Sequence, residues 1–98
     1  MASKKVLNYN YAFVFYDVGE KRVAKVFKLC KKYLAHFQYS VFRGDITPSK
    51  LIRLRNELNK VIVPQEDFVC IIKLLNSNVY GEETLGSGGF ISGEELIL

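Results

Sequence analysis

Residues 9–17, with the sequence YNYAFVFYD, restrict the fold most, because as a strand they are apolar on both faces. The side chains on one side are Tyr9, Tyr11, Phe13 and Phe15, and those on the other are Ala12, Val14 and Tyr16. Such a strand must be covered on both faces, so we predict that it lies at the centre of its sheet. Asp17 alternates in step with Phe13 and Phe15, and its carboxylate is therefore expected on the same side of the strand as these two rings.

The next segments change between helical and strand patterns. Residues 19–34 are expected to form a helix, whose apolar face consists of Val23, Val26, Phe27, Cys30, Tyr33 and Leu34. Residues 36–41 and 42–46 are β-branched and aromatic, so we predict two short strands joined by a tight turn.

A second helix is expected to begin with Thr47 as its N-cap and Pro48 at its first position, and to end before Pro64. Its predicted buried stripe consists of Leu51, Ile52, Leu54, Leu58, Val61 and Ile62. Residues 67–75, DFVCIIKLL, are nearly all apolar and predict a further strand. The glycine-rich remainder has a short predicted strand around residues 83–85.

The order of these elements is strand, helix, strand, strand, helix, strand. It predicts an α+β fold, the ferredoxin-like βαββαβ sandwich, as one domain over residues 1–98 with residues 76–98 as a C-terminal tail. In that fold the last strand lies at an edge, and here it is too apolar to remain uncovered. We therefore predict a homodimer in which the tail packs on the edge strand of its own chain or of its partner.

Charge and composition favour an intracellular protein with a polyanionic partner. The net charge is +4, with most lysine and arginine before residue 61 and only acids after residue 78. No apolar stretch approaches the roughly 18 residues of a membrane span, and no signal peptide is recognisable. Cys30 and Cys70 are expected to be buried free thiols in a reducing compartment, the cytoplasm.

Several individual residues can be interpreted either as structural or as functional. Asp17 with Glu20 three residues later matches a capping box, which by itself favours a helix N-cap. The lysines of the first helix are either a solvated face or a phosphate-binding stripe. His36 is expected at the surface or at a strand end. Exposed aromatic side chains on such a sheet also suit RNA binding, although the usual third-strand motif is missing.

Four segments together resemble a known family: FVFYDV, FQYSVFRGDI, TPSKLIRLRNELNKVI and EDFVCIIKLL. In this combination and order they resemble CRISPR-associated protein two, the small non-integrase protein of spacer acquisition in the CRISPR-associated endoribonuclease family. The similarity extends over about residues 9–98. It implies a ferredoxin-like fold and a homodimer whose sheets face each other, with each C-terminal segment reaching the partner's sheet.

The resemblance also implies an activity and a site. Family members are metal-dependent endonucleases on single-stranded RNA or double-stranded DNA, or non-catalytic bridges that hold the CRISPR integrase and DNA. Asp17 matches the catalytic aspartate, which holds Mg²⁺, with Mn²⁺ as an alternative, together with Asp17 of the partner. The positions implied as nucleic-acid contacts are Lys21, Arg22 and Lys25, and Tyr16 and Phe42 are implied as structural residues near the site. His36 stands where some members have arginine.

Three hypotheses therefore follow from the sequence. The first is a metal-dependent phosphodiesterase with paired Asp17 residues as ligands. The second is a non-catalytic DNA-bridging subunit that binds the integrase. The third, outside the family, is a small RNA-binding ferredoxin-like domain.

Overall fold

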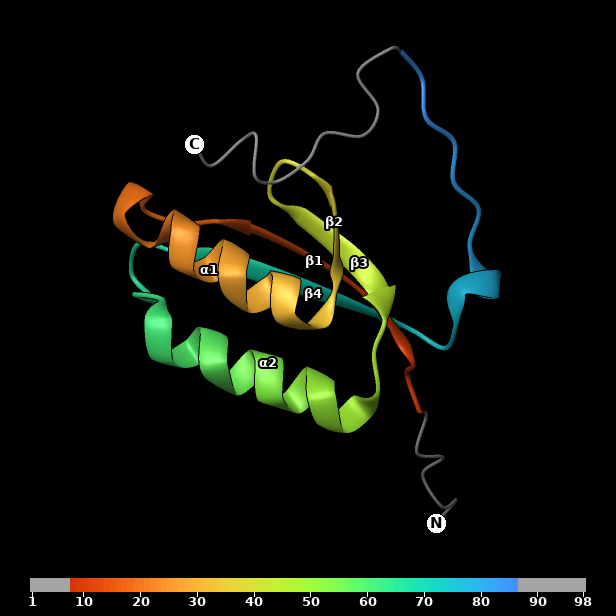
Figure 1. The fold of residues 1–98 in the computed structure, drawn as a ribbon, viewed down its shortest axis with the longest axis horizontal. Helices are drawn as coiled ribbons and strands as arrows, with labels where there is room; N and C mark the ends of the chain where they lie inside the picture. The colour runs from red at the N-terminus through yellow and green to blue at the C-terminus, as the bar shows by residue number, and fades with distance from the viewer. Residues whose placement is uncertain (1–7, 87–98) are drawn as a thin grey trace.

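The computed structural model describes residues 8–86 and contains the predicted βαββαβ order of elements (Figure 1). The elements are β1 (Tyr11–Asp17), α1 (Glu20–Tyr33), β2 (Ala35–Gln38), β3 (Val41–Asp45), α2 (Pro48–Val61) and β4 (Phe68–Leu74), followed by a short 3₁₀ turn, η1 (Ser77–Val79). The α+β ferredoxin-like fold is thereby confirmed.

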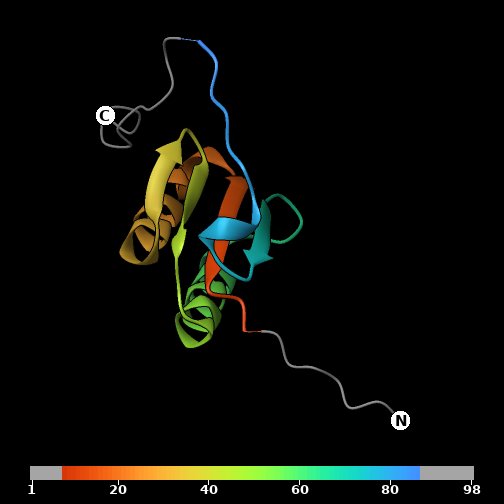
Figure 2. The ribbon, with the colours of Figure 1, turned by 90° about the vertical axis from the view of Figure 1, so that its right-hand side faces the viewer.

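The strands form one antiparallel sheet in the order β2-β3-β1-β4. The first strand is central as predicted, and Phe13 lies opposite Arg43 on β3 and Ile72 on β4. Both helices cover the same face of the sheet (Figure 1), and Figure 2 shows them behind the strands. The opposite face, which carries Phe13 and Phe15, has no α-helix among residues 8–86.

The core lies between the sheet and the two helices. The sheet contributes Ala12, Val14, Tyr16 and Phe42, and the helices contribute Val26, Phe27, Cys30, Leu51, Leu54 and Leu58. Phe42 is fully buried, with its ring 5.0 Å from that of Phe27 and 6.3 Å from that of Tyr16, measured between ring centroids. These contacts hold β1, β3 and α1 in fixed positions relative to one another.

The start of α2 agrees with the sequence. Thr47 is the N-cap and its Oγ1 accepts a hydrogen bond from the backbone N–H of Lys50 at 3.3 Å, while Pro48 is the first helical residue. Ile52 was expected in the buried stripe, but its side chain is 48% exposed. The expectation was wrong because α2 lies beside the edge strand β4, where the sheet is too narrow to cover that side of the helix.

The segment after β4 crosses the face of the sheet opposite the helices, in cyan and blue in Figure 2. Tyr80 packs on Tyr11 and Phe13, its hydroxyl donates a hydrogen bond to the Tyr11 hydroxyl at 2.9 Å, and Glu82 pairs with Arg43. The strand predicted at residues 83–85 is not formed, because these residues have no strand partner within the described chain. The remaining tail, including the glycines at 88 and 89, lies outside the described residues.

Between residues 8 and 86, neither helix has the length and apolar character needed to cross a membrane.

Candidate functional site

Asp17 is the last residue of β1 and lies opposite Phe68 on β4. Its side chain is exposed on the helix-free face of the sheet, next to the half-buried Phe15. Among residues 8–86 its carboxylate has no hydrogen bond and no ion pair. The central strand therefore presents one acid that is available to an external ligand.

The expected capping role of Asp17 is wrong. The N-cap of α1 is Gly19, and no side chain of the neighbouring sequence caps this helix. The Gly19 backbone N–H instead donates to Asp67 Oδ1 at 2.7 Å. An acid distant in the sequence thus satisfies the start of α1, and Asp17 keeps both oxygens free of the helix.

Asp67 is the acceptor of a dense hydrogen-bond network although its side chain is fully covered from solvent. Besides the Gly19 N–H, it accepts from the Val63 N–H at 2.8 Å, from Arg22 Nε at 2.5 Å and from Arg22 Nη2 at 2.9 Å. The Arg22 hydrogen bonds, with those of the two backbone N–H groups, hold the pKa of this carboxyl well below its usual range. Asp67 was not among the predicted site residues, and its sequence signal was the pair of acids, Glu66 and Asp67, directly before an apolar strand.

The predicted phosphate contacts occupy two different environments. Lys21 and Lys25 are exposed on α1. Arg22 is 20% exposed, and its guanidinium binds Asp67 and, at 3.0 Å, Glu66. These carboxylates raise the pKa of the Arg22 guanidinium above its usual range. The three phosphate roles stay predictions, but in this structure the charge of Arg22 is already neutralised.

Tyr16 and Phe42 lie behind the site. Both are buried on the helix side of the sheet, and their rings are stacked with an interplanar angle of 22°. Burial raises the pKa of the Tyr16 hydroxyl above its usual range. Both rings lie on the helix side of the sheet, whereas the Asp17 side chain points to the opposite face.

Comparison with known proteins decides the family. The family described as CRISPR associated protein Cas2 matches residues 10–81. The chain belongs to the Cas2 family. Among its relatives, "CRISPR-associated endoribonuclease Cas2" of Thermotoga maritima is 41% identical over 76 residues, which are 78% of this chain and 87% of that protein. "CRISPR-associated endoribonuclease Cas2 3" of Thermodesulfovibrio yellowstonii is 43% identical over 86 residues, or 88% of this chain and 98% of that protein.

Solved Cas2 structures have the same fold. A structure described as "Crystal structure of cas2" has a TM-score of 0.75 and 33% identity, covering 81% of this chain and 88% of that one. The Streptococcus pyogenes Cas2 structure at pH 6.5 has a TM-score of 0.66 and 32% identity, covering 78% of this chain and 99% of that one. The resemblance drawn from the sequence is thereby confirmed.

His36 of this Cas2 family member is a core residue, and the expectation of a surface position was wrong. Its ring is 8% exposed, with centroids 5.1 Å from Phe27 and 5.0 Å from Phe42. Nε2 lies 2.7 Å from the Tyr39 carbonyl oxygen, which can only accept, so Nε2 carries the proton. Nδ1 has no partner among the described residues. The aromatic pocket, which sequence spacing does not reveal, accounts for the burial of His36.

An apolar surface surrounds Asp17 on the helix-free face. Phe68 and Ile72 are 56% and 45% exposed, and the rings of Phe15 and Phe68 have centroids 6.2 Å apart. Cys70, expected to be buried, is half-buried on this face opposite Phe15, whereas Cys30 is buried in the core. We call Phe13, Phe15, Phe68 and Ile72 the aromatic face.

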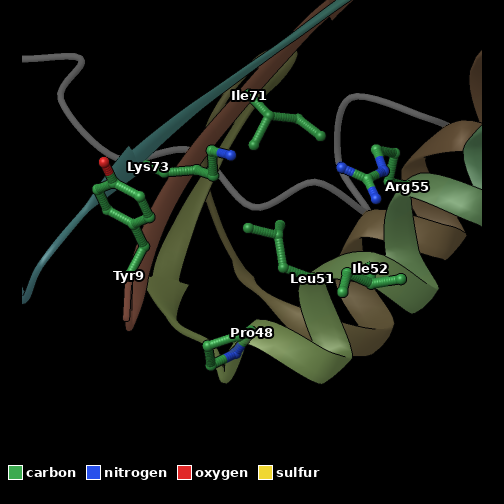
Figure 3. Close-up of a pocket in the computed structure, with 7 residues that line it drawn as sticks. All are labelled: Tyr9, Pro48, Leu51, Ile52, Arg55, Ile71 and Lys73. Carbon is green, nitrogen blue, oxygen red and sulfur yellow. The ribbon is translucent and has the colours of Figure 1, made fainter. Parts of the chain in front are cut away.

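A groove of about 390 Å³ runs between α2 and β4 (Figure 3). Its lining residues are Tyr9, Pro48, Leu51, Ile52, Arg55, Ile71 and Lys73. Arg55 comes from the helix and Lys73 from the edge strand, with Ile71 and Leu51 between them (Figure 3). The edge of β4 and the apolar side chains beside it are thus uncovered in the described part of the chain, and their covering by the tail of this chain or of a partner stays a prediction.

The potential metal ligands of residues 8–86 are isolated groups. Residues 8–86 contain no cluster of three or more histidine, cysteine, aspartate or glutamate side chains that could hold an ion. Asp17 supplies one unpaired, exposed carboxylate. Mg²⁺ is typically bound by one or two carboxylates with several waters, so two copies of Asp17 suit it and a buried cage is not required.

Proposed function

We propose that this Cas2 family member is a CRISPR-adaptation endonuclease that hydrolyses phosphodiester bonds of single-stranded RNA or double-stranded DNA. The names of its relatives, which call them endoribonucleases, support cleavage of RNA. The carboxylate of Asp17 carries the proposal, because it lies exposed at the end of the central strand and is free of any bond to residues 8–86.

In this proposal Asp17 and Asp17 of a second copy hold one Mg²⁺, for which Mn²⁺ can substitute. When bound, such an ion activates water and neutralises charge on the phosphate. Asp17 contributes negative charge and oxygen ligands, and the aromatic face beside it limits the access of water to one side of the site.

The aromatic face supports a homodimer. Phe68 and Ile72 expose large apolar surfaces next to Asp17, and a second copy packed there would cover them and bring two Asp17 residues toward each other. In the same proposal residues 76–98 exchange with or pack on the partner and cover the groove beside β4. Within residues 8–86 both surfaces remain apolar and exposed, which is unfavourable for a stable monomer of that part of the chain.

The basic side of α1 is proposed to contact the phosphate backbone of the nucleic acid. Lys21 and Lys25 are exposed and close in sequence to Asp17, so they can bind phosphates without breaking an existing ion pair among the described residues. Such contacts are independent of sequence and weaken as salt increases.

A cleavage assay tests the activity. The dimer is incubated with labelled single-stranded RNA and double-stranded DNA in Mg²⁺, Mn²⁺ or excess chelator, with Asp17→Ala and Asp17→Asn alongside. The exposed Glu20→Gln, three residues away, is the matched control. We expect cleavage with either metal for wild type and Glu20→Gln, and a loss of at least about 100-fold in both Asp17 variants, typical of losing an essential group. Equal rates in all four proteins would refute the proposal.

A second candidate function is a non-catalytic bridge that holds DNA and the CRISPR integrase. It is favoured because each chain would contribute only the Asp17 carboxylate from the end of β1 to the proposed site, and because residues 8–86 contain no ligand cluster. Under this function Asp17→Ala leaves spacer integration intact, while neutralising Lys21 and Lys25 weakens DNA binding. An integration assay with the purified integrase therefore separates the two functions.

A further inference from the structure

We infer that Asp67 and Arg22 are positioning residues for Asp17. The inference rests on the proposed function and assigns these two residues a role in holding the turn that follows the metal-binding carboxylate. The Asp67 side chain is fully covered, and Arg22, which is 20% exposed, is paired with it, so neither is assigned a contact with the ion.

Asp67 connects three segments that meet behind Asp17. It accepts from the N–H of Gly19 in the turn after β1, from Arg22 in the first turn of α1 and from the N–H of Val63 after α2. Its own N–H donates to the Val63 carbonyl at 2.8 Å, which closes the loop before β4. One fully covered carboxylate thus connects the turn after β1 to the loop before β4.

The strand register places this network directly at Asp17. Asp17 pairs with Phe68, the residue after Asp67, and Gly19 is two residues after Asp17. Asp17 is therefore held by its strand pairing with Phe68, and Gly19, two residues later, is held by its hydrogen bond to Asp67. A side chain at position 19 would overlap the Arg22 guanidinium, so a larger residue there would displace Arg22 from its position beside Asp67.

The network also keeps Arg22 away from Asp17. An arginine five residues after an exposed carboxylate could pair with it. Here, however, Arg22 Nε and Nη2 donate to Asp67, and Nη2 also donates to Glu66. Asp17 consequently stays unpaired within residues 8–86. A phosphate contact through Arg22 Nε would require breaking its bond to a carboxylate that is fully covered from solvent, which is unfavourable.

The test compares metal binding and kinetics in Asp67→Asn, Asp67→Ala, Arg22→Gln and Arg22→Lys. Mn²⁺ affinity is measured by titration, and hydrogen exchange of the Gly19 amide reports the turn without any metal. Glu57→Gln is the matched control, because it breaks the Lys32–Glu57 ion pair at the opposite end of α1. Lys21→Gln is the comparison for a phosphate contact.

We expect Mn²⁺ affinity to fall about 10- to 100-fold in Asp67→Asn and Arg22→Gln, as is usual for residues that orient a metal ligand. Gly19 exchange should accelerate in both, kcat should fall with KM nearly constant, and Arg22→Lys should recover part of the loss. Lys21→Gln should raise KM alone, and Glu57→Gln should change nothing. Asp67→Asn keeps two acceptor contacts and serves as the variant that folds if Asp67→Ala does not.

Two outcomes would overturn the inference. One is wild-type Mn²⁺ affinity in folded Asp67→Asn and Arg22→Gln. The other is a change confined to KM in Arg22→Gln, which would make Arg22 a phosphate contact. If wild type itself binds no Mn²⁺ through Asp17, the proposed function fails instead, so the two failures are distinct.

Discussion

Asp17 ends β1 and Asp67 directly precedes β4 at the same end of the sheet, and their surroundings give these two aspartates different chemistry. Asp17 is exposed and unbonded within residues 8–86, whereas Asp67 is covered and accepts hydrogen bonds from two backbone groups and Arg22. The first has the properties of a ligand for an external cation. The second is an internal acceptor that joins α1 to the loop before β4.

Acid unfolding should reveal Asp67. Its pKa is lowered in the folded state, so it stabilises the fold above the unfolded pKa of about 4, and that stabilisation is lost as pH falls toward the folded pKa. Urea unfolding should show that the wild-type free energy of unfolding falls more steeply below pH 4 than that of Asp67→Asn. Glu66→Gln, at an exposed position, should follow wild type. Parallel curves for all three proteins would contradict this account.

At the scale of elements, α2 and α1 begin by different means. Thr47 and Pro48 start α2 with local groups, so this end was predictable from the sequence. The start of α1 depends on Asp67, which is distant in the chain, and the local capping pattern at Asp17 was misleading. His36 and Ile52 were also misplaced, since one is enclosed by aromatic side chains of other elements and the other lies beyond the sheet's edge.

The strands were more predictable than these side chains. The segment that became β1 is apolar on both faces, and the pattern alone required a central position. Periodicity also placed Asp17 on the aromatic face. It could not show that the carboxylate is unpaired, because that depends on where the side chains of Asp67 and Arg22 meet.

The Thr47 cap gives a prediction for α2. Thr47→Ala removes the acceptor of the Lys50 N–H and should lower the free energy of unfolding by about 1 kcal/mol. Thr47→Ser keeps the acceptor and is the control. Chemical denaturation measures both, and a Thr47→Ala protein as stable as wild type would show that the 3.3 Å hydrogen bond contributes nothing.

At the scale of the whole molecule, the single chain leaves two apolar surfaces uncovered within residues 8–86. One is the aromatic face around Asp17, and the other is the groove between α2 and β4. The segment around Tyr80 covers only the part of the sheet near Tyr11 and Phe13. A homodimer would cover what remains and would also complete a two-carboxylate metal site.

The dimer can be tested by sedimentation velocity at micromolar concentration. Wild type should sediment as a dimer and Ile72→Lys as a monomer, because a lysine at this position would place a charge in the proposed interface. Ala24→Lys, on the exposed side of α1, should remain dimeric. A monomeric wild type, or a dimeric Ile72→Lys, would exclude this face as the interface.

The stoichiometry of Mn²⁺ binding to the purified protein tests the central claim most directly. If two Asp17 residues share an ion, titration should give one Mn²⁺ per two chains, and Asp17→Ala should abolish this binding while Glu20→Gln retains it. One ion per chain, or unchanged binding in Asp17→Ala, would contradict the claim that the acid at the end of β1 is a metal ligand shared across a dimer.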